Sequence, residues 1–151
     1  MILKHSHDTS VEMLMDVYRE LSDKMTKHRV VSFLKYLRNN DLNLNQYSIL
    51  SYIDQQGPCL PLQFAEHLEL KAATITYLVD SLEQRGLVRR TPNPRDGRSH
   101  YVHYTDAGRE LVQGARSEGD ESIMESFKQL DQDEADMLYI MLNLLRRKLF
   151  T

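Results

Sequence analysis

The sequence contains a single cysteine, Cys59, among 151 residues. An intramolecular disulfide is therefore excluded, and a reducing compartment fits the composition. No apolar run approaches the roughly 20 residues that cross a bilayer. The first ten residues, MILKHSHDTS, lack the long apolar core of a signal peptide. We therefore expect a cytoplasmic protein that is not in contact with a membrane.

Motifs of the common enzyme classes are also missing from the sequence. There is no glycine-rich phosphate loop, no serine nucleophile elbow and no zinc-protease helix. Acidic pairs such as Asp131 and Asp133 stand at the start of an expected helix, where carboxylates stabilise the helix dipole. We expect neither an enzyme activity nor a cofactor.

The net charge of −3 hides a strong segregation of charge along the chain. Residues 85–109 carry six arginines against two aspartates, whereas residues 117–136 carry eight acidic residues against one lysine. A basic centre and an acidic C-terminal part follow from these counts. A nucleic-acid site would therefore be local, not spread over the whole protein.

The spacing of apolar residues predicts a mainly α protein with one small β-hairpin. The length fits one domain with helical extensions. Asn43 is expected to cap a helix that Gly57-Pro58 ends, and Pro61 to open a short helix. Strands are expected at 87–91 and 100–104, joined by a loop over 92–99. The other helices are expected at 9–38, at 71–86, after Thr105 and after Asp131, where Glu134 completes a capping box.

The helix over 71–86 has an unusual outer face for a solvated helix. Its apolar stripe falls at positions i, i+3, i+4 and i+7, whereas the other residues of its first turns are small or hydrogen-bonding. A short helix, a turn, this helix and a basic hairpin together predict a winged helix-turn-helix, whose second helix enters a major groove of DNA. The residues expected to contact DNA from this helix are Lys71, Ala72, Ala73, Thr74, Thr76 and Tyr77.

The hairpin would follow the DNA backbone, and an arginine at its tip could enter a narrow minor groove, where the negative potential is enhanced. The alternative is that these arginines are solvated surface charges. The presence of the helix pair just before them favours contact with DNA. The hairpin residues expected at the DNA are Arg89, Arg90, Arg95, Asp96 and Arg98.

From about residue 42 to 112 the chain resembles the MarR family of bacterial transcriptional regulators. The resemblance rests on an ordered set of motifs and not on any one of them. These motifs are Phe64-Ala65-Glu66-His67-Leu68, Ala73-Thr74-Ile75-Thr76-Tyr77-Leu78-Val79-Asp80, Leu82-Glu83-x-Arg85-Gly86-Leu87-Val88, the Asp96-x-Arg98 wing signature and Thr105-x-x-Gly108.

The resemblance implies a homodimer held by the first helix and the last two helices. It divides the chain into an N-terminal dimerisation helix (1–41), a DNA-binding lobe (42–105) and C-terminal dimerisation helices (106–151). In the wing, Asp96 would hold an arginine through a charge-assisted hydrogen bond and Arg98 would enter the minor groove. Gly97 stands where the family often has a basic residue, so one phosphate contact is expected to be missing.

Many proteins of the family release DNA when a small aromatic or anionic ligand binds between the dimer helices and the DNA-binding lobe. The residues that could form such a pocket here are Tyr18, His28, Arg29, Phe33 and Tyr47. Cysteine-based redox sensors of the family have a cysteine near the start of the first helix, and this chain has none there. His5 and His7 near the start, and His100 and His103 in the hairpin, show no convergent metal-ligand spacing.

The sequence thus predicts a homodimeric repressor that binds a pseudo-palindromic operator in double-stranded DNA and is released by a small ligand. Two alternatives stay open. One is a metal-responsive regulator of the same fold. The other is a winged-helix module that binds a protein and no DNA, which the net charge of −3 would suit.

Overall fold

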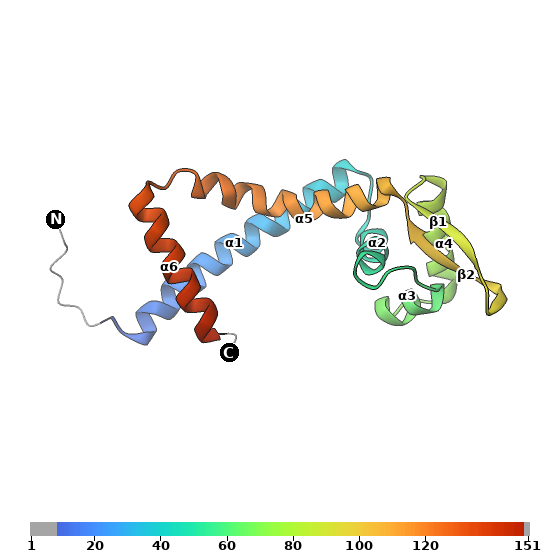
Figure 1. The fold of residues 1–151 in the computed structure, drawn as a ribbon, viewed down its shortest axis with the longest axis horizontal. Helices are drawn as coiled ribbons and strands as arrows, with labels where there is room; N and C mark the ends of the chain where they lie inside the picture. Colours follow the sequence, from blue (N-terminus) through green and yellow to red (C-terminus); the bar gives the residue numbers. More distant parts are fainter. Residues whose placement is uncertain (1–8, 150–151) are drawn as a thin grey trace. The chain divides into compact units, whose positions relative to one another are not determined.

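A computed structural model of the chain describes residues 9–149. These residues are mostly helical, with one two-stranded antiparallel hairpin, which confirms the expected fold class (Figure 1). No helix in this part of the chain is long and apolar enough to cross a membrane. In chain order the elements are α1 (Val11–Asn39), α2 (Leu44–Gln56), α3 (Pro61–Leu68), α4 (Ala72–Gln84), β1 (Val88–Asn93), β2 (Asp96–Tyr104), α5 (Asp106–Phe127) and α6 (Gln132–Leu149).

The described residues form two compact units. Residues 31–118 form one, called here the winged unit, and the described residues up to Val30 form the other with those from Gly119 onward, called here the outer unit. Helices α1 and α5 each contribute residues to both units. The division of the chain into regions 1–41, 42–105 and 106–151 stays a prediction.

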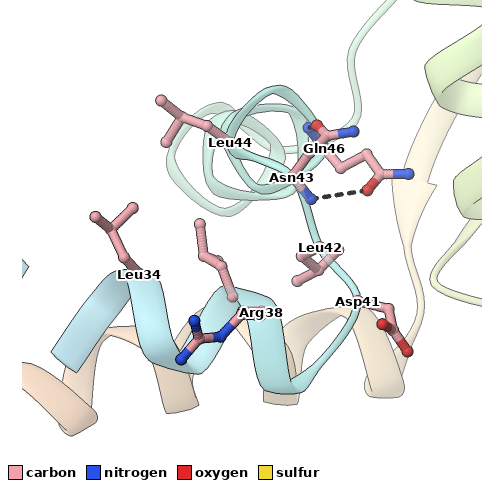
Figure 2. A pocket seen from close by; sticks show the side chains of 8 residues that line it. Leu34, Arg38, Asp41, Leu42, Asn43, Leu44 and Gln46 are labelled. Carbon is pink, nitrogen blue, oxygen red and sulfur yellow. Dashed lines mark hydrogen bonds between the residues drawn. The ribbon is translucent and has the colours of Figure 1, made fainter. Parts of the chain in front are cut away.

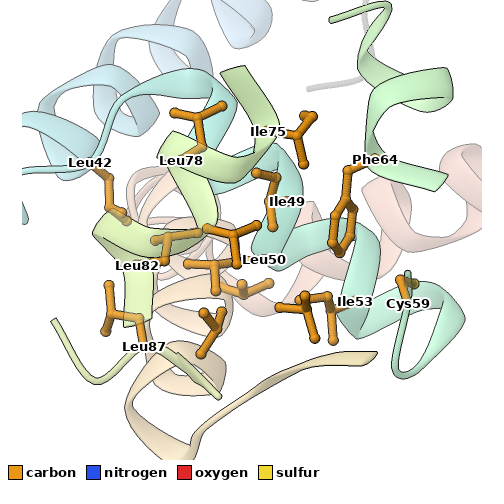
Figure 3. Packing of buried hydrophobic residues seen from close by; sticks show 14 of the residues in the cluster. Leu42, Ile49, Leu50, Ile53, Cys59, Phe64, Ile75, Leu78, Leu82 and Leu87 are labelled. Carbon is orange, nitrogen blue, oxygen red and sulfur yellow. The ribbon is translucent and has the colours of Figure 1, made fainter. Parts of the chain in front are cut away.

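The core of the winged unit lies where α2, α3 and α4 meet the hairpin (Figure 3). The expected stripe of α4 is fully or almost fully buried, and so is Phe64 of α3. Val102 of β2 and Val112 of α5 are completely buried and close the other side of this core. Because one apolar face of every element points into the same cluster, the outward face of α4 is fixed. The stripe of α4 consists of Ile75, Leu78, Val79 and Leu82.

The helix boundaries follow the local signals in the sequence. Asn43 and Gln46 form a capping box, since the Gln46 backbone N–H donates to Asn43 Oδ1 (2.9 Å) and the Asn43 N–H donates to Gln46 Oε1 (3.1 Å). Asp131 and Glu134 form the same box at the start of α6. These predictions are confirmed. The Gln46 amide also donates to Ser81 Oγ (3.1 Å), which connects α2 to α4.

The strands of the hairpin are longer than predicted, and the expected loop over 92–99 is wrong. β1 and β2 continue to Asn93 and Asp96, which leaves a turn of two residues, Pro94 and Arg95. The ladder is irregular between Pro92 and Asn93, because Pro92 lies opposite His100 whereas Asn93 lies opposite Asp96. A side-chain hydrogen bond connects the two strands at this irregularity, since Asn93 Nδ2 donates to Ser99 Oγ (2.9 Å). The polar residues that predicted a loop therefore stabilise a bulged strand end.

Gly108 lies where α5 touches the start of β1, and Thr105 caps the helix just before it. The Thr105 hydroxyl accepts the Gly108 N–H (3.2 Å) and donates to the Gly86 carbonyl (2.6 Å). A Cβ atom added at Gly108 would lie 2.2 Å from the backbone oxygen of Leu87. Backbone cannot rotate away as a flexible side chain can, so only glycine fits here.

We expect the Gly108→Ala substitution to destabilise the winged unit by about 1–3 kcal/mol, the usual cost of overpacking. Chemical denaturation followed by circular dichroism would measure this free energy of unfolding. Gly97→Ala is a matched control, because a Cβ atom at Gly97 meets nothing within 4 Å. Equal stability of the two variants would contradict the close approach at Gly108.

The outer unit exposes much of its apolar surface. Arg29 of α1 forms an ion pair with Asp120 of α5 (3.4 Å), and a Cβ atom added at Gly119 would lie 3.6 Å from the Arg29 side chain. Helix α6 has no buried residue, although it is rich in large apolar side chains. The large apolar residues of this unit that are exposed include Val11, Leu14, Val17, Leu21, Met137, Tyr139, Ile140, Met141, Leu144 and Leu145.

Candidate nucleic-acid interface

The front of α4 presents its polar and small residues to solvent. Burial of the apolar stripe turns every residue predicted for DNA contact outward, and all six are exposed. Tyr77 is 71% exposed, an unusual state for a large aromatic side chain. The Thr76 hydroxyl donates to the Ala72 carbonyl (3.1 Å), which leaves its lone pairs free to accept a hydrogen bond. The six residues are Lys71, Ala72, Ala73, Thr74, Thr76 and Tyr77.

A tight turn positions α4 against α3. Glu69 adopts a left-handed conformation (φ 53°), and the Leu70 N–H donates to the Ala65 carbonyl (3.0 Å). Helix α4 then starts after Lys71, whose backbone is extended and whose side chain gives no cap. The first backbone N–H groups of α4 therefore lack a side-chain acceptor, and such groups bind anions such as phosphate readily.

The tip of the hairpin carries Arg95 and Arg98 in full exposure. Asp96 lies between them, and its Oδ1 accepts the backbone N–H of Arg98 (3.1 Å). The Asp96 carboxylate thus holds Arg98 through its backbone N–H, and the entry of Arg98 into a minor groove stays a prediction. Asn93 likewise accepts the backbone N–H of Arg95 through its Oδ1 (3.0 Å). The tip is held by these bonds, and neither guanidinium group has an ion-pair partner among residues 9–149.

Two of the arginines in the basic segment serve the fold. Arg85 donates to the carbonyl oxygens of Asp41 and Asn40 (2.7 Å each), where it caps the end of α1. Arg90 pairs with Asp80 of α4 (2.5 Å) and with Glu83. Burial lowers the pKa of Arg90, but the hydrogen bonds and charges of Asp80 and Glu83 outweigh burial and raise it. The Arg90 guanidinium group is thus paired within the chain, and its contact with DNA stays a prediction.

A hollow of about 600 Å³ separates the hairpin from α3 and α4. Four residues predicted for DNA contact line it, namely Thr76 of α4 and Arg90, Asp96 and Arg98 of the wing. Sequence reasoning missed the other six residues of its wall, which include Leu62 and His100. Leu62 is 66% exposed. It could have been found from the sequence as an apolar residue on the polar side of a short amphipathic helix. Arg89 does not line this hollow and lies on the other face of β1.

The five residues predicted for a ligand pocket divide between the two units, and the pocket stays a prediction. Tyr18, His28 and Arg29 belong to the outer unit, and Phe33 and Tyr47 belong to the winged unit. Tyr18 and His28 lie ten residues apart in α1, about 15 Å along its axis. Phe33 and Tyr47 pack edge to face with ring centroids 4.8 Å apart, so they fill space instead of lining it.

The winged unit instead has an open groove of about 480 Å³ where α1 ends and α2 begins (Figure 2). Leu34 and Arg38 project into it from α1, and Leu44 from the start of α2. Leu34 and Leu44 are 52% and 57% exposed, so the walls are apolar and accessible. One cation beside two apolar walls is a combination that can hold a small aromatic or anionic molecule.

Cys59 is buried and forms an isolated bridge with Val102 of β2. Burial raises the pKa of the Cys59 thiol, which keeps it in the less reactive protonated form. The His103 ring is hydrogen-bonded to Thr91 Oγ1 (2.7 Å). Within residues 9–149 no cluster of three or more histidine, cysteine, aspartate or glutamate side chains could hold a metal ion. His5 and His7 lie outside the described residues.

Helices α3 and α4, followed by the basic hairpin, define the chain as a winged helix-turn-helix protein. A family model described as "MarR family" matches residues 42–100. An HTH-type transcriptional regulator of Mycobacterium bovis is 31% identical over 66% of this chain and 70% of that protein. The chain belongs to the MarR family of transcriptional regulators.

Other relatives share the same class of name. An HTH-type transcriptional regulator of Bacillus subtilis, YkoM, is 27% identical over 90% of this chain and 88% of its own length. An HTH-type transcriptional repressor of Pseudomonas putida, IacR, is 27% identical over 78% of this chain and 70% of that protein.

Solved structures agree with this fold. A transcriptional regulator of Thermotoga maritima superimposes with a TM-score of 0.72 at 25% identity, over 89% of this chain and 92% of that one. A mutant of S. aureus MepR, solved bound to an oligodeoxyribonucleotide, superimposes with a TM-score of 0.68 at 23% identity, over 90% and 97% of the two chains.

Proposed function

We propose that this chain is a homodimeric repressor that binds a pseudo-palindromic operator in double-stranded DNA. The observation that carries the proposal is the surface shared by α4 and the hairpin, where Thr76 and Arg98 face one hollow. Helix α4 would enter the major groove, with Thr74 and Thr76 at base edges and Tyr77 at a phosphate. Arg95 and Arg98 would contact the backbone and the adjacent minor groove. Arg90 would act indirectly, by neutralising Asp80 and Glu83 beside this surface.

The dimer is supported by the apolar surface of the outer unit. Ile140 and Tyr139 of α6 are 66% and 71% exposed, and α6 buries no side chain within its own chain. Contiguous exposed apolar surface of this kind usually marks an interface. A two-fold dimer would place two copies of α4 about one helical turn of DNA apart. We place this activity in the cytoplasm, where a regulator meets bacterial DNA.

Repression and its relief form the last part of the proposal. A dimer seated on an operator blocks access to the DNA that it covers, and a small ligand would release it. The groove of Figure 2 supports ligand binding, since Arg38 stands beside the apolar side chains of Leu34 and Leu44. A ligand bound in this groove would contact the junction of α1 with α2. Gln46 of α2 donates a hydrogen bond to α4, so a shift of this junction would reach α4.

The direct test is a titration of the purified protein onto a DNA fragment from upstream of its own coding region, at two salt concentrations. We expect binding that exceeds binding to random DNA and that weakens steeply as salt rises, because phosphate contacts release counterions. Absence of DNA binding even at low salt would contradict the proposal and favour the protein-interaction module.

A further inference from the structure

A second hollow of the winged unit, of about 270 Å³, is lined by residues of α2, the hairpin and α5, and none of its lining residues belongs to α4. Successive side chains of a strand point to opposite faces, and Arg90 contacts α4. Its neighbour Arg89 therefore points the other way, beside His103, its partner in the β ladder. The last turn of α2 and the first turn of α5 close this hollow through Asp54 and Arg109.

The charges that face this hollow are not balanced. Among the described residues, neither Arg89 nor Arg109 has a carboxylate within ion-pair distance. Asp54 is the one acidic residue in the lining, and its carboxylate is already paired with Arg116 (2.7 Å). Burial and the positive charge of Arg89 lower the pKa of His103, so the charge of Arg89 is felt inside the hollow.

The side chains of the hollow are also held in position. The Arg109 guanidinium lies over the ring of Tyr104, 5.2 Å from its centroid, in a cation–π contact. His103 is fixed by its hydrogen bond to Thr91. Ile53 and Pro58 form an apolar wall on the side of α2. Two guanidinium groups without a carboxylate partner among the described residues, one of them held over an aromatic ring, are suited to bind an oxyanion through paired hydrogen bonds.

We propose that this hollow binds a compact phosphate group, as free phosphate or in a small phosphorylated molecule, between Arg89 and Arg109. The volume is slightly below that of ordinary ligand pockets, which restricts the ligand to a small one. The phosphate would cross-link the base of the wing to α5 and the end of α2. Its source is a small molecule and not the DNA backbone, because no residue of α4 or of the wing tip lines this hollow.

The test is calorimetric titration of inorganic phosphate into the full-length protein, without DNA and in a phosphate-free buffer of low ionic strength. We expect saturable binding at one site per chain. Arg89→Gln and Arg109→Gln should each weaken it by at least about tenfold, the loss of a charge-assisted contact. Lys128→Gln is the matched control, since Lys128 is exposed, pairs with Glu125 and is not among the residues that line this hollow. Circular dichroism would establish that all three variants are folded.

Two outcomes would overturn the proposal. One is phosphate binding by the unaltered protein that does not saturate, or that both arginine variants retain. The other is no phosphate binding together with a loss of DNA affinity in Arg109→Gln as large as that in Arg98→Ala, which would assign the hollow to the DNA backbone. Because the phosphate titration contains no DNA, failure of the DNA-binding proposal leaves this result unchanged.

Discussion

Replacing Arg98 with alanine is expected to weaken operator binding by roughly a hundredfold or more. A hydrogen bond to a charged group contributes about 1.5–3 kcal/mol, and a dimer loses two such contacts at once. Arg98 is exposed, and its backbone is held by Asp96 whatever its side chain, so the fold of the hairpin should persist. The measurement is fluorescence anisotropy of labelled operator DNA at several salt concentrations.

The salt dependence separates a lost phosphate contact from a damaged fold. Removing one phosphate contact in each wing should reduce the slope of log affinity against log salt by about one per wing. Lys128→Ala, which removes an exposed cation outside the wing, should leave both affinity and slope unchanged. An Arg98→Ala protein with the affinity and slope of the unaltered chain would remove the wing from the proposed mechanism.

The local parts of this structure could be predicted from the sequence, because their causes lie within a few residues. Asn43 reaches the backbone of Gln46 and Thr105 reaches that of Gly108 within one helical turn. The stripe of α4 has one regular period, so its burial and the exposure of Thr74 and Thr76 follow together. The outward face of α4 could thus be predicted without knowledge of any tertiary contact.

The fate of each arginine could not be predicted in the same way. Arg85 bonds to backbone carbonyls 44 and 45 positions earlier in the chain, and Arg90 bonds to acidic residues on another element. A long charged side chain can reach many partners, so its choice depends on tertiary packing. The basic hollow at Arg109 could not be predicted for the same reason, because only the tertiary fold brings α2, the hairpin and α5 together.

Replacing Ile140 with glutamate is expected to convert the dimer into monomers. Ile140 is 66% exposed in the single chain, so a charge there should cost the isolated fold little. In a dimer built on α6 the same charge would be buried without a partner, which costs several kcal/mol, and it would occur twice. The dimer dissociation constant should rise by at least about a hundredfold. Sedimentation equilibrium should then give the mass of one chain, 17.7 kDa, instead of twice that value.

The comparison with Gln132→Glu makes this result specific to the apolar face. That variant adds the same charge at the exposed start of α6, where an acidic residue suits the helix dipole, and it should stay dimeric. Monomeric Ile140→Glu protein should also bind operator DNA far more weakly, because a monomer carries one copy of α4 and can contact only one half-site at a time. If Ile140→Glu stayed dimeric, the α6 face would not be the interface. If it became monomeric with full affinity for the operator, the two-fold reading of DNA would be wrong although the dimer itself is real.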